Sequence, residues 1–180
     1  MNTPNALVLS RVLASPLLFA LLVFYSEIKD WGLHESWINY FCSLIFGLAA
    51  LSDFFDGFVA RAWQQSTKLG EILDPLADKM LILAALLGLM LLGRAEAFLV
   101  YLILIREFFI TGFRVVLVSE GLSVKASIWG KLKTTAQMIA MIFLFMDWVL
   151  GSTFFYICFA LTMYSGWEYV ASYLKAKREG

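Results

Sequence analysis

Four aspartates in one stretch of the sequence have the residue type and the spacing of a metal-binding site. Asp53 and Asp56 are three residues apart, and Asp74 and Asp78 are four apart, so each pair shares one face if its segment is helical. Carboxylate oxygens are hard ligands that suit Mg²⁺ or Mn²⁺. Four carboxylates can hold two ions at the roughly 3.5–4 Å separation of two-metal phosphoryl-transfer sites. The stretch therefore predicts a centre for two Mg²⁺ or Mn²⁺ ions.

The residues around the aspartates suit a ligand that contains phosphate. Gly57 follows Asp56 directly, and its missing side chain lets a ligand approach the backbone. Arg61 carries a planar guanidinium that matches phosphate oxygens, while Ala60 and Gly70 are small enough for two helices to approach closely. The alternative is that the aspartates are interfacial charges that end two helices, but no group of bases balances four of them.

The sequence as a whole is too apolar for a soluble domain of its length. Apolar residues make up 61% of the 180 residues and charged residues 16%, against usual values of about 45–50% and about 25%. The mean hydropathy is +0.79, and the zero net charge argues against a nucleic-acid partner. We therefore expect an all-α, integral membrane bundle that forms a single domain over residues 1–180.

Six apolar segments have the roughly 20 residues that a membrane-spanning helix needs. They are Leu7–Tyr25, Trp37–Ala62, Leu69–Leu92, Ala95–Val118, Ile128–Leu150 and Phe154–Leu174. Most Lys and Arg residues fall at one set of segment ends, and the other set holds Lys29 and Arg94. By the positive-inside rule, both termini and the stretch Asp53–Asp78 face the cytoplasm. The connection that contains Lys29 and His34 is expected to be an outer loop.

A second group of charged residues lies in the fourth and fifth segments. Arg106 is about a dozen residues into an apolar segment, so it should face the bundle interior or a water-filled cavity. Arg114 follows about two turns later near the same face, and Glu107 is placed to orient an arginine. Lys131 and Lys133 lie at the start of the next segment. These bases predict an anion pocket beside the metal centre, although the lysines alone would also satisfy the positive-inside rule.

The stretch from Asp53 to Asp78 reads D-x-x-D-G-x-x-A-R-x8-G-x3-D-x3-D. It resembles the signature of the CDP-alcohol phosphotransferase family of phospholipid-synthesis enzymes, and all eight specified positions are met at the right spacing. The resemblance implies the family's membrane fold of six helices over the whole chain, usually as a homodimer. It also implies a metal-dependent enzyme whose donor substrate is a CDP-lipid such as CDP-diacylglycerol.

The resemblance further implies a role for each matching residue. The two ions would be bound by Asp53, Asp56, Asp74 and Asp78. Asp78 would also be the general base that deprotonates the acceptor alcohol. The cytidine diphosphate part of the donor would be held by Asn5, Gly57, Ala60, Arg61 and Thr67.

Two further stretches bear on the acceptor alcohol. R-E-x6-R at residues 106–114 and G-K-x-K-T-x-x-Q at residues 130–137 resemble the bacterial branch of the family that uses sn-glycerol 3-phosphate and makes phosphatidylglycerol phosphate. On this resemblance the acceptor phosphate is bound by Arg106, Arg114, Lys131 and Lys133. The protein would then be a multi-pass enzyme of the bacterial cytoplasmic membrane, with its site facing the cytoplasm. Inositol phosphate, serine or another small alcohol are the rival acceptors.

Two other classes of protein are alternatives to this enzyme. Intramembrane carboxylates also mark the ion or proton pathways of carriers, but a carrier is expected to place them near the bilayer midplane, often in repeated halves, and the sequence contains no repeat. A non-catalytic membrane protein stabilised by metal would explain the aspartates. It would not explain the basic residues of the fourth and fifth segments.

Overall fold

The computed structural model describes the backbone of residues 3–63, 68–119 and 127–179, and the side chains of residues 9–52, 76–77, 79–117 and 127–174. This part of the chain folds into helices joined by short turns. The helices are α1 (Thr3–Val23), α2 (Tyr25–Asp30), α3 (Glu35–Trp63), α4 (Lys68–Leu91), α5 (Ala97–Ser119), α6 (Ile128–Phe145) and α7 (Gly151–Glu179). The all-α class predicted from the sequence is confirmed.

Each of the six long helices covers most of one predicted apolar segment. Apolar runs of this length therefore located the helices to within a few residues at most ends. Within the described residues, no helix combines the length and the apolar character that crossing a membrane requires.

A short helix, α2, replaces the outer loop expected after the first segment. The run Tyr25–Asp30 contains no glycine or proline, and Glu27 in its first turn and Lys29 in its last turn complement the helix dipole. The amide of Trp31 still donates to the Glu27 carbonyl (3.1 Å). Gly32 then follows with a φ of +94°, in the left-handed region that glycine adopts readily, and the helix stops there.

The sixth helix, α6, ends at Phe145, short of the predicted end of its segment. The chain turns at Asp147, whose φ of +55° is left-handed and is tolerated better by aspartate than by most residues. The Asp147 amide donates to the Leu144 carbonyl (3.2 Å) and the Trp148 amide donates to the Phe143 carbonyl (3.1 Å), which is the Schellman pattern. The rings of Phe143 and Trp148 pack edge to face, 4.9 Å apart, and complete the motif.

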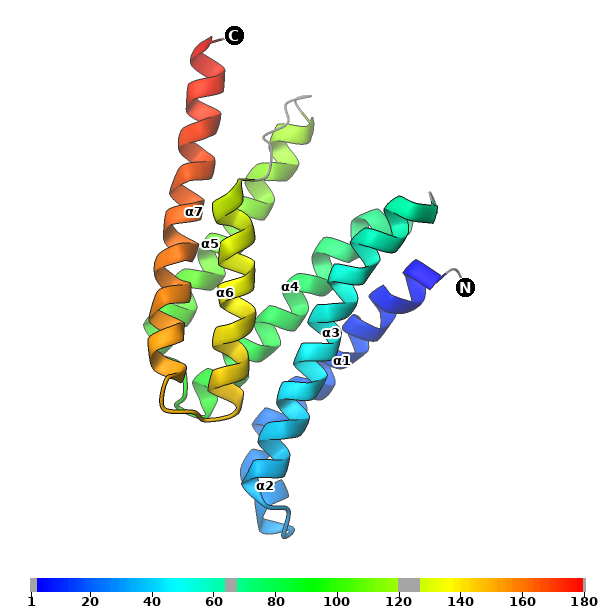
Figure 1. Ribbon diagram of the computed structural model, residues 1–180, viewed down its shortest axis with the longest axis vertical. Helices are drawn as coiled ribbons and strands as arrows, with labels where there is room; N and C mark the ends of the chain where they lie inside the picture. Colours follow the sequence, from blue (N-terminus) through cyan, green and yellow to red (C-terminus); the bar gives the residue numbers. More distant parts are fainter. Residues whose placement is uncertain (1–2, 64–67, 120–126, 180) are drawn as a thin grey trace.

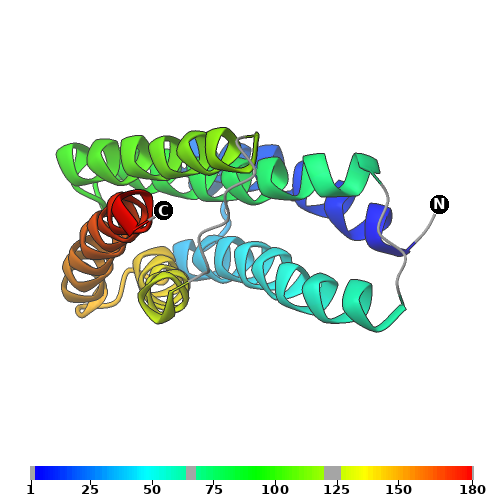
Figure 2. The ribbon, with the colours of Figure 1, turned by 90° about the horizontal axis from the view of Figure 1, so that it is seen from above.

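The six long helices form a closed ring of contacts in the order α1, α4, α5, α7, α6, α3 and back to α1. Figure 2 shows two layers of this ring, with α1, α4 and α5 in one and α3 and α6 in the other, and α7 lies at one end between α5 and α6. In Figure 1 the helices spread apart toward the upper half, where α1 begins and α7 ends. The end of α3 and the start of α4 lie in the same half.

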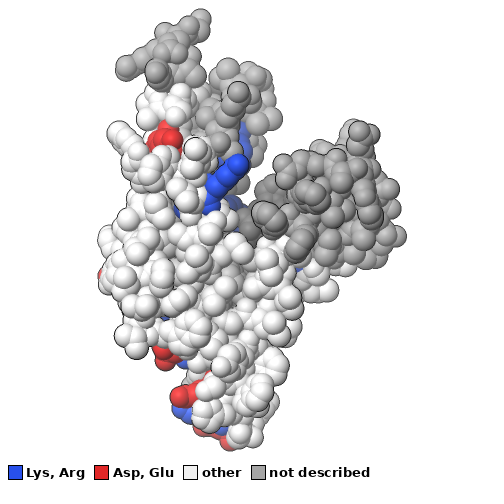
Figure 3. Space-filling model, viewed as in Figure 1, with Lys and Arg blue, Asp and Glu red and all other residues white. Residues whose placement is uncertain are grey.

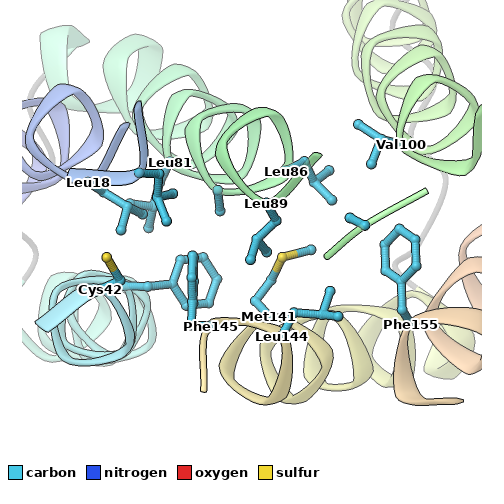
Figure 4. Packing of buried hydrophobic residues seen from close by; sticks show 14 of the residues in the cluster. Leu18, Cys42, Leu81, Leu86, Leu89, Val100, Met141, Leu144, Phe145 and Phe155 are labelled. Atoms are coloured by element: carbon cyan, nitrogen blue, oxygen red, sulfur yellow. The ribbon is translucent and has the colours of Figure 1, made fainter. Parts of the chain in front are cut away.

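Apolar side chains from all six long helices fill the interior of the ring (Figure 4). The rings of Phe46 on α3 and Phe145 on α6 lie 5.5 Å apart and join these two neighbouring helices of one layer. Gly88 on α4 lies against Leu22 on α1, so closely that a Cβ atom at Gly88 would be 2.7 Å from Leu22 Cβ. Because Gly88 has no side chain, the Leu22 side chain of α1 packs directly against the backbone of α4.

Candidate functional site

The four aspartates predicted as metal ligands lie on α3 and α4, which contact each other and run antiparallel. One pair is seven and ten residues before the end of α3, and the other is six and ten residues after the start of α4. At 1.5 Å per residue, both pairs lie about 9–15 Å from those helix ends. Two contacting helices thus carry the four aspartate positions at matching depths, and carboxylate is the type of ligand that Mg²⁺ or Mn²⁺ prefers.

The side chains of these aspartates lie outside the described side chains, as do those of Asn5, Gly57, Ala60 and Arg61, while Thr67 lies outside the described residues altogether. Asn5 is placed on α1, and Gly57, Ala60 and Arg61 on α3. Among the side chains that the structure does describe, no three His, Cys, Asp or Glu residues come close enough to hold a metal ion.

A buried carboxylate, Glu107 on α5, gathers three basic side chains. Its Oε2 accepts a hydrogen bond from Lys79 Nζ on α4 (2.6 Å), and its Oε1 accepts from Lys133 Nζ on α6 (2.5 Å). Oε1 also accepts from Nη1 of Arg106, the preceding residue on α5 (3.2 Å). We call Glu107, Lys79, Arg106 and Lys133 the Glu107 cluster. It joins three helices from both layers of the ring.

Two members of the Glu107 cluster are buried. Glu107 is 3% exposed and Lys133 is 7% exposed. A charge at such a position is expensive unless it is paired and hydrogen-bonded, and the shared carboxylate supplies both requirements for the two lysines. With three cations and one carboxylate, the cluster's own side chains carry a net charge of +2, which suits a ligand with negative charge.

Two consecutive residues of α7 shape the seat of Arg106. Ser165 Oγ accepts a hydrogen bond from Arg106 Nη2 (2.8 Å) and itself donates to the Thr162 carbonyl (3.1 Å). Gly166 leaves the space that the arginine fills, because a Cβ atom there would lie 2.8 Å from Arg106 Nε. The guanidinium is therefore fixed between α5 and α7.

The start of α6 directs Lys133 into the cluster. Ser127 is the N-cap residue, and its Oγ accepts a hydrogen bond from the Gly130 amide (3.2 Å), which satisfies one of the free donors at the helix start. With the first turn fixed in this way, Lys133 points into the bundle. Lys131, two residues earlier, is exposed, because positions two apart do not share a helix face.

The structure thus brings together two of the four bases predicted for the acceptor phosphate, Arg106 and Lys133. Arg114 is exposed, and its guanidinium lies over the Tyr169 ring, 5.6 Å from the centroid. Lys131 is also outside the cluster. Lys79, Ser165 and Gly166 were missed at the sequence level. The available signals were that Lys79 directly follows Asp78 and that Gly166 stands among large aromatic residues.

The chain is similar in sequence to known proteins. The family model of CDP-alcohol phosphatidyltransferase matches residues 1–164. Three proteins named CDP-diacylglycerol–glycerol-3-phosphate 3-phosphatidyltransferase are similar to the chain. The protein from Bacillus subtilis is 34% identical, with 93% of both chains covered, and that from Escherichia coli K12 is 36% identical, with 95% of this chain and 94% of the relative covered.

The third relative, from Cereibacter sphaeroides, is 37% identical over 148 residues, which are 81% of this chain. The match spans only 63% of that relative's own length. The two longer alignments and the family model nonetheless extend over most of the chain, including the four aspartates and, in α5 and α6, the residues of the Glu107 cluster. The chain therefore belongs to the CDP-alcohol phosphatidyltransferase family.

Proposed function

We propose that the protein transfers a phosphatidyl group from CDP-diacylglycerol to sn-glycerol 3-phosphate, forming phosphatidylglycerol phosphate and releasing CMP. The donor is supported by family membership and by the signature over Asp53–Asp78. The acceptor is supported by the names of the relatives. In this chain one observation carries it: Arg106 and Lys133 meet from different helices at a cluster with excess positive charge. An acceptor that itself carries a phosphate needs such a pocket.

The donor half of the reaction is assigned to the signature residues. The metal ligands are proposed to be Asp53, Asp56, Asp74 and Asp78. Two Mg²⁺ or Mn²⁺ ions bound there would supply neutralisation of the charge on the diphosphate. The cytidine diphosphate contacts are proposed to be Asn5, Gly57, Ala60, Arg61 and Thr67. Arg61 is suited to pair with the phosphates.

The transfer step is assigned to Asp78 and the acceptor's hydroxyl. Asp78 takes the proton from the hydroxyl as its oxygen attacks the phosphorus that carries diacylglycerol. The bond from that phosphorus to the bridging oxygen of the diphosphate breaks, and CMP leaves with that oxygen. Arg106 and Lys133 hold the acceptor's phosphate, so that its hydroxyl faces the donor. Arg114 and Lys131, which are exposed, guide the anion toward this pocket.

We also propose that the protein is a multi-pass protein of the bacterial cytoplasmic membrane with six spanning helices. Both termini and the site would face the cytoplasm. Support comes from the lipid donor and from the surface, where many large apolar side chains are exposed, such as Phe98 at 64% and Trp167 at 75%. Such exposure marks interaction with a membrane or another protein. Figure 3 shows that most of the described surface on this face carries no charge. A homodimer is proposed from the family resemblance.

The decisive experiment measures CMP release by the purified protein from CDP-diacylglycerol in the presence of Mg²⁺ or Mn²⁺. The acceptors are sn-glycerol 3-phosphate, inositol phosphate, serine and glycerol. We expect sn-glycerol 3-phosphate to exceed serine and glycerol by about 100-fold or more in kcat/KM, because a pocket built for phosphate rejects ligands that lack it. It should exceed inositol phosphate, whose phosphate the same pocket can bind, by a smaller factor, and a chelator should stop the reaction. If inositol phosphate is the best acceptor, the acceptor assignment is wrong. If no acceptor releases CMP, the whole proposal is wrong.

A further inference from the structure

Glu107 is the acidic member of the Glu107 cluster and is 3% exposed, and the reaction proposed above gives it no role. It cannot be a direct ligand of the acceptor's phosphate, because two negative charges repel each other. Both of its oxygens are also occupied, one by Lys79 and the other by Lys133 and Arg106. Its influence on the reaction must therefore pass through these three cations.

The three cations connect the donor part and the acceptor part of the proposed site. Lys79 is the residue directly after Asp78 on α4, the helix that carries two of the proposed metal ligands. Arg106 on α5 and Lys133 on α6 are the proposed ligands of the acceptor's phosphate. Glu107 contacts all three within 3.2 Å, so it fixes the distance between the acceptor pocket and the helix of the proposed base.

We propose that Glu107 is a positioning residue that ties the acceptor-phosphate pocket of Arg106 and Lys133 to α4 through Lys79. This inference rests on the proposed function and adds a determinant of acceptor use to it. Without the carboxylate, the two lysine ammonium groups lose the common acceptor that holds them 2.5–2.6 Å from its oxygens. Like charges then separate, and the phosphate pocket loses its fixed place relative to the donor.

The test is Glu107→Gln, which keeps the shape of the side chain and removes its charge. We expect the KM for sn-glycerol 3-phosphate to rise about 10- to 100-fold and kcat to fall by a similar factor, since a misplacement of about 1 Å can cost about 100-fold in rate. The KM for CDP-diacylglycerol should stay within twofold. Equal increases in both KM values, or values within twofold of the wild type for both substrates, would overturn the proposal.

A matched control is available at the opposite end of the molecule. Glu35 pairs with Lys29 (2.9 Å), and both side chains are more than half exposed. Glu35→Gln removes a carboxylate–lysine pair of the same kind at the surface, and it should leave all three kinetic constants unchanged. If the wild type itself releases no CMP with any acceptor, the proposed function has failed, whereas an active wild type with an unaffected Glu107→Gln variant rejects only the positioning role.

A second variant keeps the test decisive if Glu107→Gln does not fold. Lys79→Met combined with Glu107→Gln removes both partners of one ion pair, so the cluster keeps its net charge of +2. Breaking only one partner of a buried pair is far more destabilising than removing both. The folded double variant should still show the raised KM for sn-glycerol 3-phosphate, and a wild-type KM would overturn the proposal.

Discussion

The neighbours of Arg106 explain why an arginine suits this position better than a lysine. A guanidinium donates from several nitrogens in fixed directions, whereas an ammonium is a compact point charge on a flexible stem. Here Nη2 reaches Ser165 on α7 and Nη1 reaches Glu107 on α5. One side chain therefore keeps a fixed orientation between two helices, as the proposed binding of the acceptor's phosphate requires.

Replacing Arg106 should impair use of the acceptor far more than use of the donor. Arg106→Ala is expected to raise the KM for sn-glycerol 3-phosphate by about 100-fold, and Arg106→Lys by about 10-fold, because lysine keeps the charge but not the two directed contacts. The KM for CDP-diacylglycerol should change less than about threefold in both variants. Steady-state kinetics with each substrate varied in turn would measure this, and equal effects on both substrates would speak against an acceptor pocket at Arg106.

Gly166 allows the same pocket to be disturbed without touching any charge. In Gly166→Ala the new Cβ atom would lie 2.8 Å from Arg106 Nε and 3.2 Å from Arg106 Cγ, so the arginine must move. We expect a rise of about 10-fold in the KM for sn-glycerol 3-phosphate, since binding groups displaced by about 1 Å lose much of their effect. Gly112→Ala on α5 is the control, because a Cβ atom there meets nothing within 4 Å; a matching loss in the control would refute the steric argument.

Single residues also mark how far the sequence could predict the site. A charged residue deep in an apolar segment predicted that Arg106 faces other protein groups, and the structure brings it to Glu107, Lys133 and Ser165. The partners themselves could not be predicted. Lys79 and Ser165 contact Glu107 and Arg106 only because α4 and α7 are neighbours of α5 in the ring. The apolar pattern of a single helix does not predict which helices will be its neighbours.

Helix positions followed from length and hydropathy, but helix ends followed from local backbone chemistry. α6 stops at a Schellman turn in which an aspartate, rather than the usual glycine, takes the left-handed position. Asp147 therefore looked like one more residue of the segment. The equivalent turn after α4 has Gly93, with a φ of +70° and a hydrogen bond from the Arg94 amide to the Leu89 carbonyl (2.9 Å). The end of α4 was predicted to within one residue.

The packing of α1 on α4 depends on Gly88. Gly88→Ala would put a Cβ atom 2.7 Å from Leu22 Cβ, which a change of side-chain rotamer cannot relieve. We expect a net loss of about 1–3 kcal/mol in the free energy of unfolding, as in other overpacked cores. Thermal or denaturant unfolding in detergent would measure the loss. In Gly47→Ala on α3, where a Cβ atom meets nothing within 4 Å, stability should be unchanged or about 1 kcal/mol higher.

The end of the molecule opposite the termini is held by one arginine. Arg94 lies between α4 and α5 and donates to Asn39 Oδ1 on α3 (2.9 Å), to the Phe145 carbonyl at the end of α6 (2.8 Å) and to the Tyr25 hydroxyl (3.1 Å). Its guanidinium also lies 5.2 Å from the centroid of the Tyr25 ring. Three helices of the described chain, α2, α3 and α6, therefore contact one side chain from the turn between α4 and α5, while the helices spread apart at the other end (Figure 1).

Arg94→Ala should destabilise the whole fold and spare the chemistry. It leaves Asn39 Oδ1 and the Phe145 carbonyl without this donor, and a buried polar group that loses its partner costs about 1–3 kcal/mol. We expect the free energy of unfolding to decrease by about 2–4 kcal/mol and kcat per folded molecule to stay unchanged. Lys29→Ala, which removes an exposed pair at the same end, should cost less than about 1 kcal/mol. A loss in Arg94→Ala no larger than in this control would contradict the joining role.

The close contact of Gly88 with Leu22 also controls the tilt of α4. Asp78 lies ten residues away, so about 15 Å of helix extends from the contact to the proposed base. Over that arm a tilt of about 4° shifts the far end by about 1 Å, and a shift of that size can lower a rate about 100-fold. A larger side chain at position 88 would therefore displace the proposed base and slow catalysis even in molecules that are still fully folded.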